Sequence, residues 1–204
     1  MFAALTPTLI VIMIVCIVIS LAIHEFMHAY VGHLLGDTTA HDEGRMTLNP
    51  LSHIDPVMTL ALPIVTILAF GFPILAAKPV PFNPDRVKFD EFGAALIAAA
   101  GPFSNLVLAI IAALIANVMG LATPLVNDIF TIFITLNVAL FVFNLVPIPP
   151  LDGSRVLYAF APEPVQQFMR SIEPFGLFVV FGLIFLGLGS FLVGINQAVI
   201  NFLP

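Results

Sequence analysis

Long apolar segments dominate the hydropathy pattern of the chain, and four of them are long enough to cross a membrane. A spanning helix needs about 20 predominantly apolar residues, and a helix satisfies all of its backbone polar groups internally, as lipid requires. The four expected spans cover residues 7–35, 93–119, 127–146 and 175–202. The pattern therefore predicts an all-α polytopic membrane protein.

A fifth apolar segment, residues 57–77, is also long enough to cross, but its sequence is broken. Pro63 and the Gly71-Phe72-Pro73 sequence favour a turn within the segment. Backbone of this kind is tolerated at membrane depth where it is buried in protein. We expect this segment to enter the membrane and return to the same side as a re-entrant hairpin.

Composition supports the membrane assignment and excludes nucleic-acid binding. Hydrophobic residues make up 60% of the 204-residue chain, charged residues make up 9%, and the mean hydropathy is +1.13. These values lie far outside the range of soluble domains. The 12 acidic residues outnumber the 6 Lys and Arg, so no basic patch is available for nucleic acid. The lipid bilayer is the expected surrounding.

A cluster of ionisable residues, His24-Glu25-Phe26-Met27-His28, lies in the second half of the first expected span. Ionisable groups are costly inside a membrane and usually mark a function there. His24 and His28 are about 40° apart on one helical face, one turn from each other. In the HExxH pattern two such imidazoles bind one zinc ion, and Glu25 can take a proton from water.

A catalytic zinc site normally has a third protein ligand. His33 lies about 140° round the helix from His28, so we expect it to be a polar group at the interface. The remaining candidates are Asp37, Asp42, Glu43, Asp55 and Asp152. Asp152 follows three prolines that cannot continue a helix, and unwound backbone at membrane depth must line a protein cavity. The alternative for this segment is a helix stop followed by an ordinary Asp-Gly turn.

HEFMH in a membrane helix, together with FNLVPIPPLDG at residues 143–153, resembles the site-2 protease family of intramembrane zinc metalloproteases, peptidase family M50. Members pair HExxH with a downstream Asn-x-x-Pro-x-x-x-x-Asp-Gly segment, and Asn144 and Asp152 have that interval. The resemblance extends to residues 44–56 and 100–105. It therefore covers most of the chain between Ile23 and Arg155.

The resemblance implies a fold, a cofactor and a reaction. His24, His28 and Asp152 would bind one Zn²⁺ per chain, and Glu25 would be the general base. Asn144 would stabilise the oxyanion or orient the substrate backbone. The expected activity is regulated intramembrane proteolysis, the cleavage of transmembrane or membrane-associated protein substrates.

Two arguments support the re-entrant hairpin. If residues 57–77 return to the side from which they enter, all six Lys and Arg lie on one side, which the positive-inside rule assigns to the cytoplasm. A full crossing would instead separate Asp152 from the histidines. We therefore expect both termini outside, and a cell-membrane protein with its active site towards the cytoplasm.

Several residues and alternatives stay open on sequence alone. Asn105 is expected to be an interhelical hydrogen-bond donor, and His53 and Asp55 either support the site or cap a segment. One membrane-embedded domain over residues 1–204 is expected, with any regulatory domain on a separate protein. The alternatives are a catalytically silent membrane protein that binds substrate or metal at the same pocket, and a zinc transporter. Transport would need ionisable residues along a complete path, whereas here they cluster near one face.

Overall fold

Four long apolar helical segments form the molecule. The computed structural model describes residues 6–53, 80–83, 86–120 and 123–204. The segments that could cross a membrane are α1 (Pro7–Leu34), α4 (Asp90–Met119), α5 (Pro124–Asn144) and the helical run Glu163–Phe202. The predictions of an all-α fold and of four spans are therefore confirmed. The expected re-entrant segment, residues 57–77, lies outside the described residues.

The starts of α1 and α5 follow one local rule. Each helix is preceded by a threonine whose hydroxyl oxygen accepts a hydrogen bond from a backbone N–H of the first turn, Thr6 from Leu9 and Thr123 from Val126. Each also has proline at its first position, where the missing N–H has no helical partner in any case. The sequence thus sets where both helices begin.

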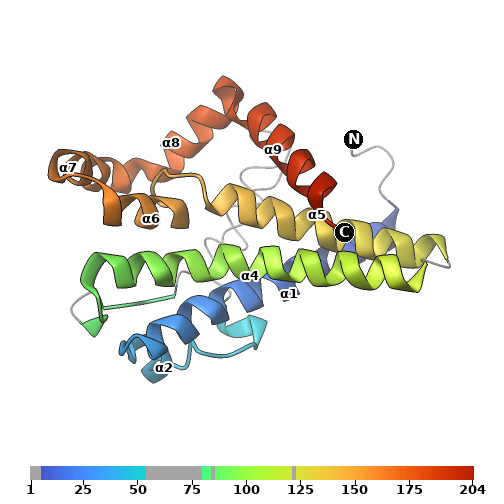
Figure 1. Cartoon of the computed structure of the whole chain (residues 1–204), viewed down its shortest axis with the longest axis horizontal. Coiled ribbons are helices and arrows are strands. Elements are labelled where there is room, and N and C mark those ends of the chain that lie inside the picture. Colours follow the sequence, from blue (N-terminus) through green and yellow to red (C-terminus); the bar gives the residue numbers. More distant parts are fainter. Residues whose placement is uncertain (1–5, 54–79, 84–85, 121–122) are drawn as a thin grey trace.

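α4 lies between α1 and α5 and contacts both (Figure 1). Small residues on α4 are buried and allow close approach of the neighbouring helices; they include Ala98, Gly101, Ala109, Ala112 and Ala113. Farther along the helix, Ala109 forms an apolar cluster with Val138 and Val142 of α5.

Two short helices follow α5 and cover the N-terminal end of α4 (Figure 1). They are α6 (Asp152–Phe160) and α7 (Glu163–Ile172), and α6 contacts α4 directly. On the other side, the end of α1 is followed by α2 (Thr39–Asp42) and by a 3₁₀ turn at Pro50–His53. Polar segments therefore gather at one end of the bundle.

The fourth apolar segment is bent. After a 3₁₀ turn at Glu173–Phe175, α8 (Gly176–Leu183) runs into a π-helical turn, Ile184–Leu188, and then α9 (Gly189–Phe202). Gly187 within the turn has φ = 109°, a conformation that glycine adopts without steric cost. Figure 1 shows the two arms meeting at an angle, with α9 returning towards α5. The span expected over residues 175–202 is thus helical but interrupted by this glycine.

Candidate metal centre

Three predicted ligands converge at one point between α1 and the start of α6. His24 Nε2 lies 3.0 Å from His28 Nε2, and Asp152 Oδ2 lies 3.1 Å from the former and 3.3 Å from the latter. Both histidines are buried, and the Asp152 side chain is 23% exposed. Residues 128 positions apart in the sequence therefore meet at one site.

Each imidazole is oriented by a hydrogen bond from its other nitrogen. The His28 Nδ1–H donates to the carbonyl oxygen of Ile97 at 2.7 Å, and this oxygen can only accept. The His24 Nδ1–H donates to Asn105 Oδ1 at 2.6 Å. With both protons held on Nδ1, both Nε2 lone pairs face the common point, as metal ligation by neutral histidine requires.

The hydrogen bond to His24 is part of a fully buried polar network that joins three helices. Asn105 Nδ2 donates to Asn137 Oδ1 at 2.9 Å and to the Ser20 carbonyl at 3.3 Å. Asn137 Nδ2 in turn donates to the Ser20 hydroxyl at 2.9 Å. Because its amide nitrogen is committed to these acceptors, Asn105 presents its oxygen to His24. The prediction that Asn105 donates between helices is confirmed, and the same side chain also orients His24, a predicted metal ligand.

The close approach of α4 to the imidazoles depends on Gly101. A Cβ atom at this position would lie 2.6 Å from His24 Nε2 and would also clash with the His28 ring. Pro102 follows inside the helix and removes one backbone N–H from its ladder. The Gly-Pro pair therefore brings bare backbone against the two histidines.

Asp152 owes its position to the turn between α5 and α6. Backbone hydrogen bonds from Ile148 to Val146 and from Leu151 to Ile148 fold the proline-containing segment back on itself. Gly153 packs so closely against the Leu145 carbonyl that a side chain there would clash. The chain is thus unwound between the end of α5 and Asp152, as the prolines predicted, whereas Asp152 and Gly153 begin α6 and form no Asp-Gly turn. The unwound segment delivers Asp152 to the histidines.

The donor set fits zinc. Two nitrogens and an oxygen about 2.0–2.1 Å from a tetrahedral zinc ion would lie about 3.3 Å from one another, close to the 3.0–3.3 Å separations found. The Asp152 side chain is 23% exposed, and neutral pH lies well above the ordinary pKa of an aspartate. The carboxylate is therefore ionised and available as a ligand.

Glu25 is the predicted general base, and Asn144 is the residue predicted to stabilise the oxyanion or orient the substrate backbone. Glu25 is buried beside the ligands on α1, and its charge interacts with His28. Asn144 ends α5 and is half-buried, and its Nδ2 donates to the Leu140 carbonyl at 3.0 Å, which leaves its second N–H for another acceptor. Their catalytic roles stay predictions.

The other candidate residues lie elsewhere. His33 is exposed, with its ring centroid 5.4 Å from that of His41, as expected of an interfacial group. Asp37 is buried but accepts hydrogen bonds from Thr39 and the Asn83 backbone, and Asp42 and Glu43 are exposed. His53 is buried and donates to the Thr47 carbonyl at 2.9 Å, so it supports its own loop. Asp55 lies outside the described residues.

Sequence reasoning missed Ser20 and Asn137. Both are fully buried polar residues inside otherwise apolar spans. Ser20 precedes His24 by one helical turn, a spacing that places it on the same face. That signal was available in the sequence, whereas the partner of Asn137 depends on how the helices pack.

Known proteins are similar in sequence to this chain over most of its length. The profile described as "Peptidase family M50" matches residues 116–187, which include Asn144 and Asp152. The "Putative zinc metalloprotease YwhC" of Bacillus subtilis is 36% identical over 190 residues, 89% of this chain and 83% of that protein. The "Putative zinc metalloprotease Rip2" of Mycolicibacterium smegmatis is 30% identical over 79% of this chain and 61% of its own length. No solved structure matches the chain significantly.

The YwhC alignment covers most of both proteins, and the family profile covers the segment that carries the third predicted ligand. The geometry of the metal centre agrees with both, because the three ligand types expected of such a protein are held together here. The apolar spans place the site in an integral membrane protein. The chain belongs to peptidase family M50, the site-2 protease family of zinc metalloproteases.

Proposed function

We propose that the chain is a zinc-dependent intramembrane endopeptidase that cleaves transmembrane or membrane-associated proteins. One observation carries the proposal: the side chains of His24, His28 and Asp152 meet at one point beside Glu25. Both histidines and Glu25 belong to α1, a helix that is apolar enough to span a membrane. A purely structural zinc site closes all four ligand positions with protein groups. Among the described residues three protein groups converge here, and the buried carboxylate of Glu25 lies beside them.

The chemistry divides between the cofactor and the protein. Zinc, when bound, supplies a Lewis acid that polarises a carbonyl and lowers the pKa of a bound water to about 7. Glu25 accepts the proton of the attacking water and returns it to the leaving amine, as general acid–base catalysis requires. The hydrogen bonds from His24 to Asn105 and from His28 to Ile97 keep both Nε2 atoms free of protons.

Substrate reaches the site from the Asp152 side in this proposal. The two histidines and Glu25 are less than 10% exposed, whereas the Asp152 side chain is 23% exposed. Asn144 ends the helix that leads to this opening, and its unused N–H would donate to the oxygen of the scissile carbonyl. A substrate helix must unwind there, because its carbonyls are otherwise bonded within the helix.

The proposed orientation has the active-site end of the bundle in the cytoplasm. Among the described residues, Lys and Arg follow α1, precede α4 or lie in α6 and α7, all at the end of the bundle that carries Asp152. The positive-inside rule assigns such an end to the cytoplasm. A cell-membrane location is proposed on the same ground.

The test is the Glu25→Gln variant, which keeps the size of the side chain and removes the base. Purified wild-type protein and the variant are reconstituted with membrane proteins that accumulate in cells expressing the variant, and cleavage is followed by mass spectrometry. We expect cleavage to fall by at least about 10²-fold, the lower range for a general base. The zinc content of both proteins should be equal.

Equal cleavage by the variant and the wild type would reject Glu25 as the base. If the wild-type protein binds zinc and the accumulated proteins but cleaves none of them, the chain is instead a catalytically silent membrane protein that uses the same pocket for binding. The Asp152→Ala variant, which lacks one ligand, serves as the zinc-depleted reference in both cases.

A further inference from the structure

A cavity of about 700 Å³ opens beside the metal centre, between the N-terminal end of α4, α6 and α7. Its volume is within the range of about 300–1,000 Å³ that is usual for ligand sites. The lining carries five charged side chains and two aromatic rings, Phe82 and Tyr158. This polar lining distinguishes it from the lipid-facing surface of the spans.

Two elements that line the cavity also carry parts of the candidate metal centre. Pro149 and Ser154 line it, and these residues flank Asp152 on both sides. On α4 the lining includes Ala94, one turn before Ile97, whose carbonyl accepts the hydrogen bond of His28. A chain bound at Asp152 would therefore pass this cavity as it leaves the site.

The charge balance of the cavity is negative. Its two cations already have partners, since Arg155 pairs with Glu173 at 2.6 Å and Arg170 pairs with Glu163 at 3.3 Å. Asp90 and Glu91 remain, and both are exposed at the cavity wall.

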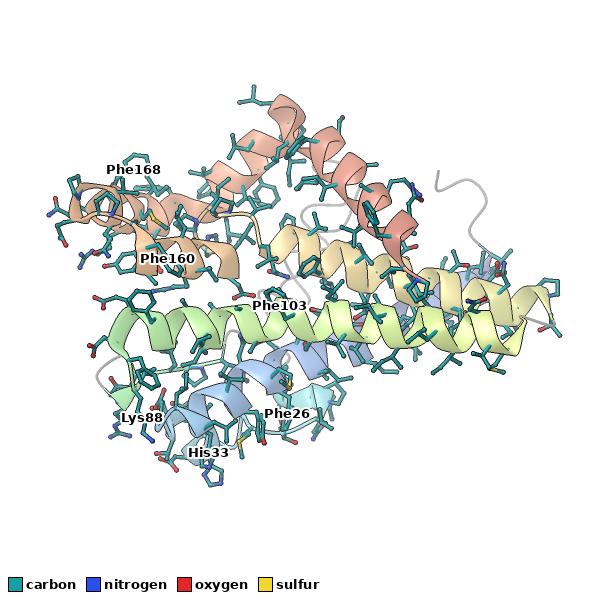
Figure 2. All side chains as sticks on the ribbon, viewed as in Figure 1. Phe26, His33, Lys88, Phe103, Phe160 and Phe168 are labelled. Atoms are coloured by element: carbon teal, nitrogen blue, oxygen red, sulfur yellow. The ribbon has the colours of Figure 1, made fainter. Side chains whose placement is uncertain are left out.

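The two other described cations that are close in sequence, Arg86 and Lys88, have contacts away from this wall. The Lys88 side chain packs against Gly36, and the charge of Arg86 contributes to lowering the pKa of Asp42. Figure 2 shows Lys88 on the α1 side of α4, whereas Phe160 marks the α6 side, where the cavity lies. Among the residues that the structure describes, no cation is paired with Asp90 or Glu91.

We propose that this cavity binds the positively charged segment that follows the span of a substrate protein, a step that rests on the proposed protease function. A substrate span whose end lies at this face has its flank on the side where Lys and Arg accumulate. The carboxylates of Asp90 and Glu91 offer such a flank a negative counter-charge. The Phe82 and Tyr158 rings each have a guanidinium group near the ring face, at 5.8 and 5.5 Å from the centroid, so the lining already accommodates cations next to aromatic rings. The site would select substrates by flanking charge and fix how far the span enters.

The proposal is tested by binding to full-length Glu25→Gln protein in phosphatidylcholine vesicles, which carry no net lipid charge. The probes are a synthetic single-span peptide followed by four lysines and the same peptide followed by four glutamines. Binding is read by energy transfer between fluorophores on protein and peptide. We expect the lysine peptide to bind roughly five-fold more tightly at low salt, a modest ratio because the carboxylates are exposed, and the ratio should shrink as salt is raised.

Variants locate the effect. The double variant Asp90→Asn, Glu91→Gln should bring the two peptides to within about two-fold of each other. The reversal Asp90→Lys, Glu91→Lys should favour a peptide that ends in four glutamates. Asp128→Asn, at the opposite end of the bundle on α5, is the matched control and should keep the lysine preference. Zinc content and unfolding temperature establish that every variant is folded.

Equal binding of the lysine and glutamine peptides to Glu25→Gln would overturn the proposal. So would a lysine preference that the Asp90 and Glu91 substitutions leave unchanged, because the preference would then arise elsewhere. The measurement uses a variant that lacks the base, so it is independent of catalysis. If the lysine preference holds while wild-type protein cleaves nothing, the protease function fails and the binding site stands.

Discussion

His24 is held by one hydrogen bond whose direction is set by residues on two other helices. Its acceptor, Asn105 Oδ1, is available because the amide nitrogen of the same side chain is bonded to Asn137 and Ser20. All three of these polar residues are fully buried. In such surroundings an amide has no water to turn towards, so the network fixes its orientation.

Replacing Asn105 with leucine should therefore weaken zinc binding by about 10- to 100-fold, the usual effect of losing such a supporting group. Asn105→Asp keeps an acceptor for His24 but loses the donor to Asn137, so it should keep zinc affinity while lowering the unfolding temperature. Affinity is measured by competition with a chromophoric chelator. Asn117→Leu, exposed on the same helix, is the control; an equal loss in Asn105→Leu and Asn105→Asp would contradict the orienting role.

Gly101 gives a second prediction at this scale. A glycine-to-alanine change inside a helix normally stabilises by about 0.5–1 kcal/mol, but here the new methyl group would displace both imidazoles. We expect Gly101→Ala to lose most of its bound zinc. Gly194→Ala in α9, where a methyl group meets open space, should keep full zinc content by metal analysis. Full occupancy in Gly101→Ala would show that α4 can move away from the site.

At the scale of elements, the bend between α8 and α9 depends on one glycine. A β-branched side chain is strongly disfavoured at the φ of 109° found for Gly187, whereas valine is tolerated in a regular helix. We expect Gly187→Val to straighten the segment and lengthen the distance between spin labels at positions 178 and 202. Gly182→Val, within the regular part of α8, should leave that distance unchanged.

The elements show which parts of the structure could be predicted from sequence. Apolar length alone located the four spans. The third was expected to begin at residue 127, whereas α5 begins at Pro124, directly after the capping Thr123. The site residues followed from local spacing and from a family resemblance. The bend at Gly187 could not be predicted from the sequence, because several glycines occur in that segment and only the packing determines at which of them the helix bends. The partners of Asn137 belong to the same class, since they depend on how three helices meet.

At the scale of the whole molecule, the candidate metal centre joins parts of the chain that are distant in sequence. The ligands come from α1 and from the start of α6, and α4 supplies hydrogen bonds to both histidines. A ligand that binds only the folded state stabilises it by about 2.7 kcal/mol at a hundred times its dissociation constant. Removing zinc should therefore loosen contacts well beyond the site.

We expect dialysis against a zinc chelator to lower the unfolding temperature of the wild-type protein by several degrees, and added zinc to restore it. In Asp152→Ala, which lacks a ligand, the chelator should have little effect. Unfolding is followed by intrinsic tyrosine fluorescence, because the chain has no tryptophan. An unfolding temperature that does not respond to zinc would show that the helices hold the site in place without it.

The separation of the ligands along the chain also bears on how the protein is made. His24, Glu25 and His28 leave the ribosome early, but Asp152 follows only after α1, α4 and α5 have been synthesised. Until then a nascent chain carries the two histidines and Glu25 without Asp152, the third predicted zinc ligand. Proteolytic competence would thus arise late in biosynthesis, when the neighbouring spans are already in the bilayer, and the translocation machinery would not meet an active protease.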